Sequence, residues 1–231
     1  MQCQHAYGLI ALKQKKIVVP RRRGRPPSDA QHAVSESHLL NEAFFAFARY
    51  GYEGMTLRAL AKQLGVSHNL INVRFGTKAD LWRCAVDAQT AIAAPPVYAA
   101  FDAPGLTAEA QLRQLMHGFC RWAHDNPEFV SMTYVEGRHA SWRLDYLVES
   151  YILPFKKRFD DLLKAVATER PVTPLTTPAL MSILVAGVGF YFAAGPTLAG
   201  LGASHEIAPG NVDRQIGALA EFILAALLPP R

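Results

Sequence analysis

The chain has 231 residues, of which half are hydrophobic, and this is enough to build one large core or a small domain beside a larger one. Its formal net charge is +5 at pH 7. The surplus of positive charge lies at the N-terminus, because residues 1–30 contain seven Lys or Arg and one Asp. A basic extension on a nearly neutral remainder predicts a polyanionic partner, either nucleic acid or an anionic membrane surface.

The cysteines do not suggest a disulfide-stabilised extracellular domain. Cys3, Cys84 and Cys120 are an odd number at wide spacing, and they form neither a disulfide framework nor a CxxC metal pair. The apolar residues near the N-terminus are followed by a lysine cluster and lack the long apolar run of a signal peptide. We therefore expect a cytoplasmic protein.

Residues 1–32 are predicted to be a flexible basic arm. Within it, the segment RRRGRPP at residues 21–27 resembles the AT-hook, a short arm that lies extended in the minor groove. Prolines prevent a helix there, and Arg22, Arg23 and Arg25 are attracted by the negative potential of a narrow A·T-rich groove. A solvated basic tail is the alternative interpretation. The position directly ahead of the helices described next favours the minor groove.

Two short helical patterns separated by a glycine follow a predicted first helix at residues 35–50. They occupy residues 56–75, TLRALAKQLGVSHNLINVRF, with Gly65 ending the first and Ser67 suited to cap the second. The first pattern has apolar residues at i, i+3, i+4 and i+7, on one helix face: Leu57, Leu60, Ala61 and Leu64. This spacing predicts a helix-turn-helix.

The outward face of the second of these helices is predicted to contact DNA bases, through His68, Asn69, Asn72 and Val73. Asn can bond adenine N6 and N7 together, and Val can meet a thymine methyl group. An ordinary polar surface is the alternative interpretation. No acid lies between residues 54 and 79, as a surface facing phosphates requires. The neighbours expected to contact DNA or position the helix on it are Thr56, Arg58, Lys62, Arg74 and Lys78.

From about Ser35 to Val86 the sequence resembles the DNA-binding domain of the tetracycline-repressor (TetR) family of bacterial transcription regulators. The matching elements, in chain order, are Tyr50-Gly51-Tyr52, Met55-Thr56, Leu60-Ala61, Gly65-Val66-Ser67, Phe75, Lys78 and Leu81. Asn69 stands where the family usually has a small residue. Asn72 stands where it has a phosphate-contacting Tyr, so that contact is not carried over. The resemblance implies a DNA-binding regulator.

The remainder of the chain shows helical patterns and no convincing strand, which predicts an all-α fold. A fourth helix begins after Thr77 and is broken by Pro95-Pro96, and Pro154 is expected to kink or divide a later long pattern. The later helical patterns lie at residues 107–126, 127–137, 141–169, 179–203 and 211–228. We predict a three-helix helix-turn-helix domain within residues 33–93 and a larger helical domain at 94–231, to which the resemblance assigns ligand binding and dimerisation.

Residues 179–203 hold no charge across twenty-five positions, which is long enough to span a bilayer. The alternative function is therefore a membrane-associated helical protein anchored through this segment. Its glycines and the lack of flanking Lys or Arg weigh against an anchor. In TetR-like proteins the last two helices of each subunit pair with their counterparts in a four-helix bundle, so the resemblance implies a homodimer that buries this segment.

Aromatic residues of the C-terminal half are candidates for a pocket that holds an apolar ligand, with core filling as the alternative interpretation. They are Phe119, Trp122, Phe129, Tyr134, Trp142, Tyr146, Tyr151 and Phe155. Of these, the ligand site is assigned to Phe119, Trp122, Tyr134, Trp142, Tyr146 and Tyr151. His117, Cys120 and His124 share one helix face, but three ligands on one helix diverge too far to close a tetrahedral metal site unaided. A packed helix face is the favoured interpretation, and no metal is assigned.

No nucleophile–base set, carboxylate pair or phosphate loop rises above chance, so we predict neither an enzyme nor a cofactor. The expected function is a sequence-specific DNA-binding regulator, a dimeric repressor released by a small apolar ligand. Its expected partners are double-stranded DNA with a palindromic operator and A·T-rich flanks, a second copy of the chain, and a small-molecule effector. We expect it in the cytoplasm, at the nucleoid when bound to DNA, without a membrane partner.

Overall fold

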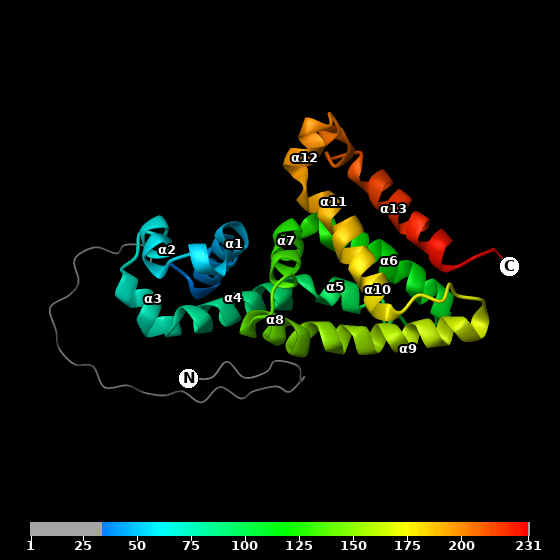
Figure 1. Cartoon of the computed structure of the whole chain (residues 1–231), viewed down its shortest axis with the longest axis horizontal. Coiled ribbons are helices and arrows are strands. Elements are labelled where there is room, and N and C mark those ends of the chain that lie inside the picture. Colours follow the sequence, from blue (N-terminus) through cyan, green and yellow to red (C-terminus); the bar gives the residue numbers. More distant parts are fainter. Residues whose placement is uncertain (1–33, 231) are drawn as a thin grey trace.

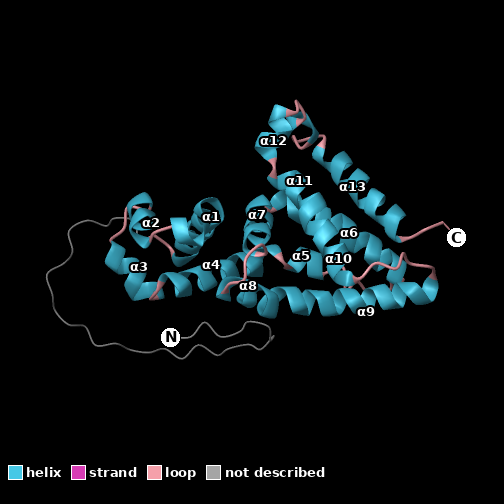
Figure 2. Ribbon diagram, in the orientation of Figure 1, coloured by secondary structure: helices cyan, strands magenta, loops and turns pink. Residues whose placement is uncertain are grey.

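The computed structural model describes residues 34–230, and within this range the regular structure is entirely helical (Figure 2). The first helices are α1 Glu36–Gly54, α2 Leu57–Gln63, α3 His68–Phe75, α4 Lys78–Ala93 and α5 Pro95–Tyr98. The middle elements are α6 Ala108–Asp125, α7 Pro127–Glu136, α8 Trp142–Leu147, the π-helical turn η1 Val148–Ile152 and α9 Leu153–Glu169. The last elements are α10 Thr177–Ile183, the π-helical turn η2 Leu184–Gly189, α11 Phe190–Ala193, α12 Gly195–Gly200, the 3-10 turn η3 Ser204–Glu206 and α13 Val212–Leu227. The all-α prediction is confirmed for the described residues.

The molecule is elongated, with α1–α3 at one end and the later helices at the other (Figure 1). Helix α4 leads from the first group into the second. The long helix α9 runs along one side of the C-terminal part, and α6 crosses its middle. Helices α10 and α11 rise from the body to α12, and α13 descends from there to the C-terminus (Figure 1).

Side-chain caps fix where the first helices begin, and the cap predicted at Ser67 is among them. The hydroxyl oxygens of Ser35, Thr56, Ser67 and Thr77 accept hydrogen bonds from backbone amides of the first turns of α1, α2, α3 and α4. Thr107 does the same for α6. These caps satisfy amides that lack an intrahelical partner, so each start is set locally.

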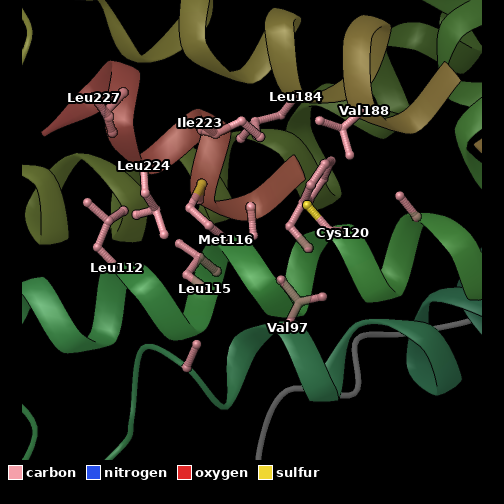
Figure 3. Close-up of a cluster of buried hydrophobic side chains, with 14 of the residues drawn as sticks. Val97, Leu112, Leu115, Met116, Cys120, Leu184, Val188, Ile223, Leu224 and Leu227 are labelled. Atoms are coloured by element: carbon pink, nitrogen blue, oxygen red, sulfur yellow. The ribbon is translucent and has the colours of Figure 1, made fainter. Parts of the chain in front are cut away.

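Two groups of buried apolar side chains form the core. The first joins α1–α4, through residues such as Phe44, Ile71 and Trp82, and it also includes Met132 of α7 and Leu147 of α8. Packing therefore continues across the predicted domain boundary at residue 93. The second group surrounds α6, which lies between α5 on one side and α13 and η2 on the other (Figure 3). Its labelled members are Val97, Leu112, Leu115, Met116, Cys120, Leu184, Val188, Ile223, Leu224 and Leu227.

Two long predicted helices are interrupted in the structure. The pattern at residues 141–169 divides into α8, η1 and α9, with the π turn directly ahead of Pro154, which removes a backbone donor. Residues 179–203 form α10, η2, α11 and α12 in succession, with a non-helical break at Ala194. The Gly195-Pro196 pair follows that break and starts a new helix.

Candidate nucleic-acid interface and internal cavity

Local backbone bonds fix the turn between α2 and α3. The Gly65 amide donates to the Lys62 carbonyl at 3.3 Å, and the Val66 amide donates to the Ala61 carbonyl at 3.0 Å. Gly65 has φ of 66°, a left-handed conformation that side chains with a Cβ atom rarely adopt. This bond pattern ends α2 sharply and sets the direction in which α3 leaves the turn.

The outward face of α3 is free while its inward face is anchored. Ile71 is 0% exposed, whereas Val73 is 75% exposed. His68 and Asn69 are also exposed, and Asn72 is half-buried. The amide nitrogen of Asn72 lies 3.2 Å from Nδ1 of His68, so these two side chains support each other one turn apart. The side chains predicted to contact bases are therefore grouped on the surface of a short, fixed helix.

The predicted basic residues fall into two groups. Arg58 is exposed on α2, as is Lys62. Arg74, in contrast, donates from Nη1 to the carbonyl of Val34 at 3.0 Å. Lys78 donates to the carbonyl of Glu53 at 3.4 Å, and its Nζ lies 4.5 Å from the centre of the Tyr52 ring. The second group is thus held in place against the protein's own backbone, with Arg74 ahead of the start of α1 and Lys78 beside its end.

The N-terminus of α4 contains an acid that directly follows the predicted acid-free stretch. Asp80 accepts from the Thr77 amide at 3.1 Å, and the Asp80 amide donates to Thr77 Oγ1 at 3.2 Å, which closes a capping box. The Thr77 hydroxyl also donates to Oδ2 of Asp80 at 2.6 Å, and this bond, with that from the Thr77 amide, holds the pKa of Asp80 below its ordinary value. Part of this helix end is therefore occupied by the chain's own carboxylate. The Thr-x-x-Asp spacing is a signal from which the box can be predicted.

The arginines of the predicted minor-groove arm, Arg22, Arg23 and Arg25, lie outside the described residues. Residues 1–32 therefore remain a prediction. Thr56, the other polar residue predicted to contact DNA, is exposed at the start of α2, where its hydroxyl accepts from the Ala59 amide at 3.1 Å.

A cavity of about 160 Å³ lies in the C-terminal part, between the end of α4 and the helices that follow. Phe119, Trp122 and Tyr151, three of the residues assigned to the ligand site from sequence, line it. The rest of the lining comes from α4, α5, α7, α9, α10 and the two π turns: Thr90, Ala93, Ala94, Val97, Tyr98, Phe129, Thr133, Ile152, Phe155, Met181, Leu184 and Val185. Both π turns thus face this cavity, and such turns occur frequently at functional sites.

The other assigned ligand residues lie elsewhere. Trp142 and Tyr146 pack edge-on against the buried Trp82, at 5.3 and 6.0 Å between ring centres, where α8 meets α4. Tyr134 is at the surface, with its ring 5.9 Å from that of Phe190. We did not predict the α4 residues of the cavity wall from the sequence. The spacing of apolar residues predicts which side chains are buried, but not which other side chains they contact.

Tyr151 joins the cavity to α4 through a shared carboxylate. Its hydroxyl donates to Oδ1 of Asp87 on α4, and the hydroxyl of Tyr146 donates to the same oxygen at 2.6 Å. Burial, and then the hydrogen bond to Asp87, raise the pKa values of both tyrosines above the ordinary value. Both phenols therefore stay protonated and can keep donating across the ordinary pH range.

The three candidate metal residues on α6 lie in different surroundings. Cys120 is 0% exposed, and burial raises the pKa of its thiol to about 12. His117 lies 3.1 Å from Glu221 of α13, and His124 lies 2.7 Å from Asp125. Within residues 34–230 no cluster of His, Cys, Asp and Glu is arranged to hold a metal ion.

Exposed apolar side chains mark the last helices. Ile183, Phe190 and Phe222 are 50%, 48% and 74% exposed on α10, α11 and α13. None of the helices in the described part of the chain is both long enough and apolar enough to cross a membrane. The segment proposed from sequence as an anchor, residues 179–203, is divided among the shorter elements described above.

The geometry defines a class of protein: a helix-turn-helix unit carried at one end of an all-helical body that contains a cavity. Comparison with known proteins agrees. Residues 39–83 match the family described as bacterial regulatory proteins, tetR family. A stretch of 72 residues is 35% identical to YezE, an uncharacterized HTH-type transcriptional regulator of Bacillus subtilis (strain 168), over 31% of this chain and 37% of YezE. The match thus spans well under half of that relative.

Solved structures resemble the chain over most of its length. The ketosteroid transcriptional regulator KstR2 of Mycobacterium tuberculosis has a TM-score of 0.65 at 16% identity, covering 87% of this chain and 99% of that chain. A putative fatty acid metabolism regulator of Clostridium perfringens has a TM-score of 0.61 at 16% identity, covering 83% and 99%. At such identities the likeness is one of fold. The family match rests on residues 39–83, and beyond them the comparison shows a shared fold.

Proposed function

We propose that the protein is a sequence-specific DNA-binding transcription regulator in which α3 enters the major groove. The observation that carries this proposal is the contrast on α3 between the buried Ile71 and the exposed Asn69 and Val73. A helix fixed from behind can present short polar and apolar side chains to base edges without rearranging. Arg58 and Lys62 on α2 would contact phosphates beside it.

The protein is further proposed to act as a homodimer through its last helices. Ile183, Phe190 and Phe222 are large apolar side chains left in water on α10, α11 and α13 in a single chain. A second copy would cover them, and twofold symmetry would set the spacing of the two α3 helices to successive major grooves. The family resemblance supports the same pairing of the last two helices.

A small ligand in the cavity is proposed to release the protein from DNA. Thr90, Ala93 and Ala94 in the cavity wall belong to the end of α4, and the start of the same helix packs against α3. A ligand that prefers one position of α4 therefore changes the population of DNA-competent dimers. One structural neighbour is described as a ketosteroid transcriptional regulator and another as a putative fatty acid metabolism regulator, which supports an apolar effector.

Selection of bound fragments from total genomic DNA tests the proposal. We expect the enriched fragments to share a palindrome with A·T-rich steps beside each half-site, and the purified protein to have the mass of a dimer. The double variant Arg23→Ala/Arg25→Ala should bind the palindrome but lose the preference for A·T-rich flanks. Enrichment without any shared sequence would contradict sequence-specific binding, and a shared site without twofold symmetry would contradict the dimer.

A further inference from the structure

Six of the fifteen residues that line the cavity are aromatic, and they come from separate elements. Tyr98 comes from α5, Phe119 and Trp122 from α6, Phe129 from α7 and Phe155 from α9. Ring edges and faces attract another ring in edge-on or offset arrangements, beyond the effect of apolar burial alone. A wall of this kind therefore favours a guest that is itself a ring.

The size of the cavity limits that guest. Its volume of about 160 Å³ is close to that of apolar cavities of about 150 Å³ that hold benzene. A single ring with one or two small substituents fills this space. A fused multi-ring skeleton or a long alkyl chain would extend beyond this space.

The polar groups of the wall are largely committed to the protein. The hydroxyl of Thr90 donates to the Val86 carbonyl at 2.8 Å, and that of Thr133 donates to the Phe129 carbonyl at 2.9 Å. The hydroxyl of Tyr151 donates to Asp87. A ligand that needed to accept a hydrogen bond from these hydroxyls would have to compete with their internal acceptors.

The charges around the cavity do not suit an ionised ligand. No Asp, Glu, Lys or Arg is among the residues that line it. The carboxylate bonded to a wall residue is Asp87, which repels anions. The guanidinium of Arg158 lies 5.6 Å from the centre of the Tyr98 ring, but it is ion-paired with Asp102. An ionised group inside the cavity would therefore lose its hydration without gaining a free partner of opposite charge.

From these observations we infer that the cavity selects a neutral molecule with one aromatic ring and no ionised group. The ligand's role as an effector rests on the proposed function. Its chemical class is inferred from the residues that line the cavity alone. The inference assigns the site to substituted benzenes, and it excludes carboxylates and long-chain fatty acyl anions as direct ligands.

Three probes test the inference on the full-length protein by calorimetric titration. Toluene and benzoate share a ring and differ in charge, while decanoate adds a long chain to the charge. We expect toluene to bind at least tenfold more tightly than either anion. Equal or tighter binding of benzoate or decanoate would overturn the inference, as would the absence of toluene binding.

A pair of matched variants locates the binding. Val185→Phe adds a ring to the cavity wall and should weaken toluene binding at least tenfold. Val135→Phe makes the same change on α7 at a side chain that is 53% exposed and outside the cavity, and it should leave the affinity unchanged. Equal effects of the two variants would place toluene elsewhere and contradict the assignment. If Val185→Phe does not fold, the three probes on the unmodified protein still decide the question.

Failure of the ligand class and failure of the proposed function give different results. Toluene that binds without changing affinity for the selected DNA would leave the ligand class intact and refute the effector role. A protein that binds its palindrome and is released by an anionic ligand, but not by toluene, would refute the ligand class and leave the regulator proposal standing.

Discussion

The surface of α3 and the cavity behind α4 are both candidate binding sites, but they are built in opposite ways. The α3 surface comes from one continuous segment, with caps at Thr56 and Ser67 and one buried anchor at Ile71. The cavity draws its wall from elements spread between residues 90 and 185. The first site thus depends on local geometry, and the second on how distant helices pack.

This difference determines what a single substitution can do. A change on the exposed side of α3 should alter binding with little effect on stability, because few side chains pack against that face. A change in the cavity region should alter both, because the same side chains hold the helices together.

The largest effect is expected at the anchor of α3. Ile71→Ala should lower the free energy of unfolding by about 4 kcal/mol, because it leaves a space behind a fully buried side chain. The matched variant Val73→Ala, two residues away and 75% exposed, should change it by less than about 0.5 kcal/mol. Urea unfolding measures both. Similar losses in the two variants would mean that the two faces of α3 are not distinct.

A second large effect is expected where α7 and α8 meet α1. Arg143 donates from Nε to both carboxylate oxygens of the buried Glu136, at 2.8 and 2.9 Å, and its guanidinium lies 4.5 Å from the centre of the Tyr52 ring. Arg143→Ala leaves that carboxylate without its partner and should cost about 3 kcal/mol of stability. Lys164→Ala, which breaks an exposed pair with Asp161, should cost at most about 1 kcal/mol.

If removal of Arg143 costs no more than removal of Lys164, the junction does not hold the two parts of the molecule together. The same urea titrations at high salt distinguish the buried ion pair of Arg143 from the exposed ion pair of Lys164. The exposed pair should weaken further with salt, while the buried pair should respond little.

A smaller effect on stability, with a specific effect on coupling, is expected at Tyr151. Tyr151→Phe keeps the ring in the cavity wall and removes the hydrogen bond to Asp87, so it should cost about 1.5 kcal/mol. It should also change the ratio of DNA affinities measured with and without toluene. Tyr146→Phe removes a bond to the same oxygen but lies outside the cavity, so it should change stability and leave that ratio nearly unaltered. Identical ratios in both variants would show that Tyr151 does not couple the cavity to DNA binding.

The smallest effect is expected at the cap of α3. Ser67→Ala removes the acceptor of the Leu70 amide, which lies 3.2 Å from the hydroxyl oxygen, and should cost about 1 kcal/mol. Ser67→Asp should retain most of the stability, since a carboxylate also caps, but it adds a negative charge at the proposed DNA surface. Loss of DNA binding in the Asp variant with stability retained would separate the two roles. Unaltered DNA binding in that variant would place the DNA contact elsewhere.

The elements whose signals are local could be predicted from sequence. Thr56, Ser67, Thr77 and Thr107 each begin a helix as expected, because a cap depends only on the residues within one turn of it. Asp80 shows the limit of counting charges over a chosen range. It lies one residue beyond the acid-free stretch at residues 54–79 and was therefore not counted. Its effect on the helix end follows from the capping box and not from composition.

The cavity could be predicted only in part, for a physical reason. The aromatic character of Trp142 and Tyr151 favours burial for both, but it does not indicate which core each one joins. One packs against Trp82 and the other lines the cavity. Likewise, the uncharged run at residues 179–203 predicts burial or a membrane, while its division into shorter elements depends on the break at Ala194 and on the π turn at Leu184–Gly189.

If the free face of α3 selects the DNA sequence, loss of the Asn69 side chain should weaken binding to the selected site alone. The affinities of the unmodified protein and of Asn69→Ala are measured for the selected palindrome and for scrambled DNA at the same salt concentration. We expect the variant to bind the palindrome about 5- to 150-fold more weakly, as for one lost base contact of about 1–3 kcal/mol, with no change on scrambled DNA. Equal affinities of the two proteins for the palindrome would contradict this expectation.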